Sequence, residues 1–205
     1  LVSGVWTGSP NVAVRLGALV DASNAQTGWQ VNNPDDTVET YNLAGKLTAI
    51  TYRPGVASQL AYDASGRVQT VTGPFGQTLT FAYDATGHVS TITAPGNKVY
   101  TYAYDTKNRL VSVTNPDHGV RGYVYENVGY PNALTGIVDE NGTRYATFGY
   151  DASGRATMSQ HAGGVDQTTI AFGSNASTMT DPRGNAYTYT FTTLSGAVMP
   201  TSVSG

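Results

Sequence analysis

A short motif recurs along this chain with a fixed period, and that period constrains the fold more than any other feature of the sequence. The segment Leu60–Gly96 contains Tyr-Asp-x-x-Gly twice, 21 residues apart. If the aromatic residue before each turn is taken as an anchor, spacings of 21, 21, 21, 21, 25, 22 and 19 residues separate Tyr41, Tyr62, Tyr83, Tyr104, Tyr125, Tyr150, Phe172 and Phe191. Counting back 21 residues from Tyr41 leads to Val20, in "VDASN". The period predicts eight or nine copies of one structural unit.

Each unit is expected to be a β-hairpin. The arm before the anchor alternates with period two, as in Leu60 and Tyr62 around Ala61, or Phe81 and Tyr83 around Ala82. One face of that arm is therefore aromatic and the other carries small or β-branched residues. We expect the aromatic rings of neighbouring hairpins to stack into a ladder.

The turn after each anchor has its own chemistry. Asp63, Asp84, Asp105 and Asp151 can accept hydrogen bonds from backbone amides two residues later, Asn42 can do the same, and Glu126 is a looser substitute. Three residues after these positions the chain carries residues that tolerate positive φ, which predicts a type I turn that ends in a left-handed residue. These residues are Asn24, Gly45, Gly66, Gly87, Asn108, Gly129 and Gly154.

The arm after the turn is less regular. Its apolar residues lie three apart, as in Val68 and Val71 or Leu110 and Val113, whereas one face of a straight strand repeats every two residues. Either a bulge lies between them or both faces of this arm are covered. The unit that ends at Tyr150 contains four extra residues, has Tyr130 in place of the usual Arg, and includes a second turn motif, "DENG", at 139–142.

These patterns predict an all-β fold of about 14–18 short antiparallel strands with hardly any helix. Residues 1–19 form a degenerate or truncated N-terminal repeat, and residues 20–205 form the repeat region. Charged residues make up 12% of the chain, and Gly (24) and Tyr (14) are abundant, which is typical of a turn-rich β protein. Because the chain begins at Leu1 without a leader pattern, we interpret it as a fragment of a longer protein.

The tandem motifs resemble the RHS/YD-repeat family. "YDASGRV", "YDATGHV", "YDTKNRL" and "YDASGRA" carry the resemblance, together with the "TVTGP", "TITAP" and "SVTNP" segments that follow the first three. The resemblance covers about residues 20–195 and extends to bacterial polymorphic toxins, insecticidal toxin complexes and teneurins. It implies a spiralling β-sheet that forms part of a hollow shell around a C-terminal toxin domain. It also implies secretion or a cell-surface location, with secretion-system components as partners.

Catalysis is not expected, and no catalytic, cofactor-binding or metal-binding residue is proposed. His88 occupies an Arg position of the repeat, His118 lies in a turn, and His161 lies in "QHAGGVD"; none has a metal-type His partner, and the chain has no Cys. The recurring Asp residues are explained by turn chemistry, whereas a catalytic pair of carboxylates would be unique. Asn141 and Asn175 fit the glycosylation sequon.

Partners are constrained by charge and composition. The net charge is −3, so the sequence does not have the excess of basic residues that is typical of nucleic-acid-binding proteins. The sequence contains no run of about 18 apolar residues, so no membrane-spanning helix is predicted. The first hypothesis is a structural wall segment of a shell whose partner is the toxin domain of the parent chain. The alternative is a carbohydrate-binding or adhesive surface module that uses exposed Tyr rings. Unpaired sheet edges further predict self-association of the isolated fragment.

Overall fold

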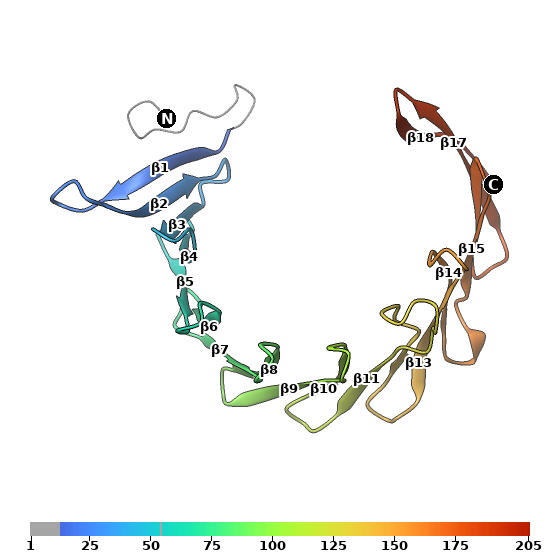
Figure 1. Ribbon diagram of the computed structural model, residues 1–205, viewed down its shortest axis with the longest axis horizontal. Coiled ribbons are helices and arrows are strands. Elements are labelled where there is room, and N and C mark those ends of the chain that lie inside the picture. Colours follow the sequence, from blue (N-terminus) through green and yellow to red (C-terminus); the bar gives the residue numbers. More distant parts are fainter. Residues whose placement is uncertain (1–12, 54) are drawn as a thin grey trace. The chain divides into compact units, whose positions relative to one another are not determined.

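The computed structural model describes residues 13–53 and 55–205, and the chain divides into two compact units at residues 100 and 101. The first unit contains eight strands and the start of a ninth, which are labelled in Figure 1 where there is room. These are β1 (Arg15–Val20), β2 (Gln26–Asn32), β3 (Val38–Asn42), β4 (Leu47–Thr51), β5 (Ala57–Tyr62), β6 (Val68–Thr72), β7 (Thr78–Tyr83), β8 (Val89–Ala94) and β9 (Lys98–Tyr104). From β1 to β8, each strand pairs antiparallel with the next.

The second unit contains the end of β9 and the remaining strands. These are β10 (Leu110–Thr114), β11 (Val120–Val124), β12 (Gly136–Val138), β13 (Arg144–Tyr150), β14 (Ala156–His161), β15 (Thr168–Phe172), β16 (Ala176–Thr180), β17 (Ala186–Leu194) and β18 (Ala197–Ser204). A 3-10 turn, η1 (Ala162–Gly164), precedes β15. Each strand again pairs antiparallel with its successor. The predicted all-β fold of tandem antiparallel hairpins is confirmed. Residues 1–12 of the expected N-terminal repeat lie outside the described residues.

The anchor turns have the predicted geometry. In the turn after Tyr62, the Asp63 amide donates to the Arg67 carbonyl at 2.8 Å, and the Gly66 amide donates to the Asp63 carbonyl at 2.8 Å. Gly66 has φ +77°, and Asn108 reaches +62° in the equivalent position. Six of the seven residues expected in this conformation adopt it, and the exception is Gly129.

The connecting turns repeat the same geometry. The Gly73 amide donates to the Gln77 carbonyl, and the Gly76 amide donates to the Gly73 carbonyl. His118 is the left-handed residue of its connecting turn, with φ +69°, and Gly142 of the predicted "DENG" turn has φ +77°. Successive strands are therefore joined at both ends mostly by the same short turn, which is why each strand pairs with its neighbour in sequence.

A bulge explains the three-residue spacing in the outgoing arms. Tyr62 pairs with Val68, but Ala61 pairs with Thr70, so the register shifts by one residue between the two pairs. The shift returns Val71 to the face of Val68, where it pairs with Leu60. Of the two alternatives left open by the sequence, the bulge is the one that the structure shows.

In each unit, the described strands form a single layer without an enclosed core. Among the described residues, Ala146 is the one buried hydrophobic side chain, at 5% exposure. The aromatic and aliphatic residues instead gather on one face and remain half-buried, as Leu60, Tyr62 and Val71 do. The opposite face carries Thr, Ala and Gln side chains. The apolar face therefore lies against the side chains of neighbouring repeats rather than beneath a second layer.

Candidate functional site

Among the described residues, a contact that recurs in four turns links a basic residue to the anchor ring of the next repeat. The Asp63 carboxylate accepts a bond from Arg67 Nε at 2.8 Å, which orients the guanidinium. The guanidinium carbon then lies 4.2 Å from the centre of the Tyr83 ring. The Tyr83 hydroxyl donates to the Val68 carbonyl at 2.6 Å. The ring is thus held by a cation on its face and a backbone acceptor at its tip.

The same contact recurs in both units. A cation lies over the following ring at 4.2–5.0 Å in four pairs: Lys46 and Tyr62, Arg67 and Tyr83, Arg109 and Tyr125, Arg155 and Phe172. The hydroxyls of Tyr62 and Tyr125 donate to the carbonyls of Leu47 and Leu110, each 15 residues earlier. The expected ring-on-ring ladder is therefore replaced, for these rings, by a ladder of cation–π contacts between consecutive repeats.

Sequence reasoning missed this role for the basic residues. No role was predicted for Arg67, because its aromatic partner lies in the next repeat. The signal that could have identified it is a fixed offset: Lys46, Arg67 and Arg109 each stand 16 residues before the ring that they contact, and Arg155 stands 17 before its ring.

Hydrogen bonds within the turns lower the pKa values of the turn carboxylates. Hydrogen bonds from the Thr86 hydroxyl and from the amides of Thr86 and His88 lower the pKa of Asp84 to about 2. The Arg109 side chain and backbone amides lower the pKa of Asp105 to about 2. Such carboxylates stay ionised near neutral pH and accept hydrogen bonds, so they are poorly suited to hold a proton as a general acid.

The three histidines lie in separate surroundings. The Nδ1 of His88 lies 2.8 Å from the Thr86 hydroxyl and 3.5 Å from the Asp84 carboxylate. His118 sits in its turn, and His161 lies 3.3 Å from Asp166. Among the described residues, no group of three or more His, Asp or Glu side chains could hold a metal ion.

The insertion after Tyr125 corrects one prediction. Gly129 does not adopt a positive φ, because the extra residues replace the short turn by a longer loop. This loop is held by Arg144, which donates to both carboxylate oxygens of Glu126 at 3.1 and 3.0 Å and to the Thr135 carbonyl at 2.7 Å. Arg144 also holds the pKa of Glu126 below its usual value.

Tyr130 takes the position that a basic residue has in the regular repeats. Its hydroxyl donates to the Ala152 carbonyl at 2.8 Å, and a Cβ on Gly154 would collide with its ring. Tyr130 therefore still reaches the turn of the next repeat, where it contacts Ala152 and Gly154.

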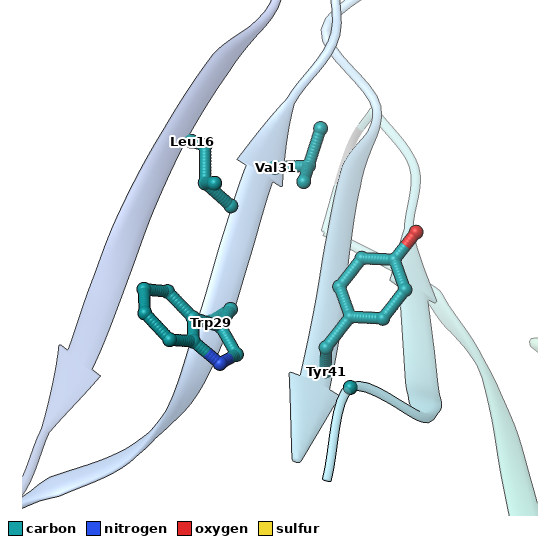
Figure 2. Close-up of a pocket in the computed structure, with 5 residues that line it drawn as sticks. Leu16, Trp29, Val31 and Tyr41 are labelled. Atoms are coloured by element: carbon teal, nitrogen blue, oxygen red, sulfur yellow. The ribbon is translucent and has the colours of Figure 1, made fainter. Parts of the chain in front are cut away.

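An apolar pocket of about 320 Å³ lies on the aromatic face of β1–β3. Figure 2 shows Leu16, Trp29, Val31 and Tyr41 projecting from three neighbouring strands; Gly45 completes the lining. The Tyr41 hydroxyl donates to Glu39 Oε2 at 2.5 Å, which raises the pKa of Tyr41.

A second, more polar pocket of about 550 Å³ lies between the turns near β15 and β16. Its lining includes two carboxylates, Asp166 and Asp181. Asp166 pairs with His161, and Asp181 accepts bonds from the Asn185 side chain and the amides of Asn185 and Arg183. Both carboxylates therefore already have partners in this part of the chain.

Comparison with known proteins identifies a family. Residues 14–183 match the family model of the teneurin YD-shell. No curated protein matches. Among solved structures, a TcdB2-TccC3 crystal structure without its hypervariable C-terminal region aligns with 95% of this chain and 11% of its own, at 16% identity and a TM-score of 0.48. A Photorhabdus luminescens Tc holotoxin pore aligns with 91% of this chain and 13% of its own, at 15% identity and a TM-score of 0.40. The chain thus spans about a tenth of the length of these structures.

No helix in residues 13–53 and 55–205 has the length and apolar character needed to cross a bilayer.

Proposed function

Since this chain belongs to the teneurin YD-shell family, whose members are structural shell modules, we propose that it is a segment of a shell wall that encloses and helps deliver a C-terminal toxin domain. In this proposal the parent protein is a secreted polymorphic toxin, and the segment itself is not a catalyst.

The single-layer architecture carries the proposal. A free-standing domain of this length would enclose a core, yet Ala146 is the one buried hydrophobic side chain among the described residues. Stability comes instead from pairing and cation–π contacts between consecutive repeats, which suits a wall that grows repeat by repeat. Such a wall needs no second layer to hold its strands in register.

Limited proteolysis of the parent polypeptide tests this function. We expect the residues beyond Gly205 to include a toxic domain that resists protease while the wall is intact. Substituting Gly154→Val should open the wall and speed cleavage of that domain. Equal cleavage rates in both proteins, or a parent chain without a toxic domain, would contradict the proposal. Recovery of the parent protein from the culture medium would test its secretion.

The adhesive alternative receives less support from the geometry. The faces of Tyr62, Tyr83 and Tyr125 are already contacted by cations, which leaves less of each ring for stacking on a sugar. A glycan array separates the two functions, because saturable binding that is lost when these residues become Leu would favour the adhesive module.

Self-association is part of the proposal for the isolated chain. β18 is exposed along its whole length and pairs with β17 on one side. Val198, at 69% exposure, and Val203, at 58%, add apolar surface to this strand. Sedimentation at rising protein concentration should show association, and a strictly monomeric profile would count against an available edge.

A further inference from the structure

The rings of Tyr62, Tyr83 and Tyr125 each lie beneath a Lys or Arg, which we call a cap. The ring of Tyr41 has no basic residue at the equivalent sequence position. Position 46, 67 or 109 supplies a Lys or Arg 16 residues before the next anchor, but the residue 16 positions before Tyr41 is Ala25. Its side chain ends at Cβ and is exposed. No cation of the described residues lies over the Tyr41 ring.

The space beside the left-handed glycine of each turn shows the same difference between Tyr41 and the capped rings. At Gly66 the ammonium of Lys46 donates to the carbonyl at 2.6 Å, and a Cβ on this glycine would collide with that ammonium. At Gly154 the ring of Tyr130 occupies this place. A Cβ on Gly45 would meet no atom within 4 Å. The space that a cap fills in other repeats is open beside Gly45.

That space coincides with the pocket in Figure 2, where Trp29 and Tyr41 supply two aromatic rings. Glu39 lies two residues before Tyr41 on the same strand face and adds a negative charge. Its oxygens accept one bond each, from Asn33 at 3.1 Å and from Tyr41 at 2.5 Å. A carboxylate can accept about four hydrogen bonds, so Glu39 retains capacity for a further donor.

We propose that this pocket binds one arginine side chain of a partner polypeptide. The guanidinium would lie over Tyr41, as Arg67 lies over Tyr83, with its donors directed to Glu39 or to the Gly45 carbonyl. Arginine is favoured because three of the four basic residues that lie over anchor rings in the described part of the chain are Arg, and because a planar guanidinium stacks on rings while it donates in plane. The site is independent of the shell function, since it depends only on the first three strands and the turns beside them.

A matched pair of probes tests the charge requirement. N-acetyl-arginine N-methylamide and its neutral citrulline analogue have nearly the same shape, and each can be titrated into the full 205-residue chain by NMR. We expect saturable shifts of the Trp29 indole and Tyr41 ring signals with the arginine probe, and binding at least fivefold weaker with citrulline. Glu39→Gln and Tyr41→Leu should each weaken binding of the arginine probe.

Ala25→Arg supplies the cap from within the chain. We expect this variant to lose binding of the probe and to unfold at a higher temperature than the parent, whereas Ala25→Gln should change neither. Equal binding of both probes would show a merely apolar pocket, and shifts caused only by a sugar would show a carbohydrate site. Either result overturns the proposal, as does an absence of saturable binding or an Ala25→Arg variant that still binds.

Discussion

In the repeat that ends at Tyr83, the preceding turn is short, and Arg67 reaches from it to cover the ring. In the repeat that ends at Tyr150, a longer loop replaces the turn, and that loop is held by Arg144 on Glu126. Both anchor hydroxyls nevertheless donate to the start of the preceding outgoing arm, at Val68 in the first case and Leu134 in the second. The bond at the tip of the ring is therefore kept in both repeats, while the turn and its basic residue vary.

The largest expected effect on stability concerns Gly154, on which the ring of Tyr130 packs. Gly154→Val should destabilise the chain by about 3 kcal/mol, because Val must adopt φ +77° and would collide with Tyr130. Gly142→Val is the matched control, since Gly142 has the same φ but nothing within 4 Å, and it should cost about 1–2 kcal/mol. Urea titration measures both, and equal losses would mean that Tyr130 does not pack on Gly154.

The second largest effect is expected for Arg144, which holds the loop after Tyr125. Arg144→Met removes two bonds to Glu126, one to the Thr135 carbonyl and one to the Thr147 hydroxyl, which should cost about 2 kcal/mol of unfolding free energy. Arg121→Met removes contacts with Glu140 alone, at 3.2 and 3.3 Å, from an Arg side chain that is 44% exposed, and should cost less than about 0.5 kcal/mol. If the two variants lost the same stability, Arg144 would be an ordinary surface residue and the loop would be held by other contacts.

The shared hydroxyl bond gives a direct test of the comparison. Tyr83→Phe and Tyr150→Phe should each cost about 1 kcal/mol, since each removes one hydrogen bond of 2.6 or 2.8 Å from a half-buried ring. Thermal unfolding of the two variants should therefore show similar losses. A loss confined to Tyr83→Phe would show that the insertion has replaced this bond as well as the turn.

The roles of residues that act within one repeat could be predicted from the sequence, and the roles of residues that act between repeats could not. The turn Asp and the left-handed Gly could be predicted from local turn chemistry: the Asp84 carboxylate accepts a bond from the Thr86 amide two residues later, and Gly66 has φ +77°. The spacing of Val68 and Val71 could not distinguish a bulge from two covered faces, because pairing register depends on the neighbouring strand. Arg67 was missed because its ring lies in the next repeat.

The prediction of a positive φ at Gly129 was wrong for a related reason. It stands where the period requires a left-handed glycine, but the period does not show where extra residues enter a repeat. Nine residues separate Tyr125 from Leu134, against six between Tyr62 and Val68, so the turn itself received most of the insertion. A glycine inside a longer loop then has no requirement for positive φ.

The smallest expected effect is a dependence of folding stability on pH, which arises from the Asp residues of the regular turns. The pKa values of Asp84 and Asp105 are about 2 in the folded chain, below the usual value of about 3.9 for an unfolded Asp. Between these values the unfolded chain binds more protons, so stability rises with pH in this window. The contribution is complete above about pH 5 and is lost as the pH falls towards 2. The urea midpoint should therefore decrease from pH 5 to pH 2.

The double variant Asp84→Asn and Asp105→Asn should reduce this decrease without removing the turns. Asn can accept the same backbone bonds, as Asn42 does from the Lys46 amide at 3.0 Å, but it cannot take up a proton in this range. Because both carboxylates are reached by solvent, salt should weaken the effect further. Unchanged pH dependence in the double variant would mean that these carboxylates gain nothing from ionisation in the folded chain, and the regular turns would then owe their stability to backbone geometry alone.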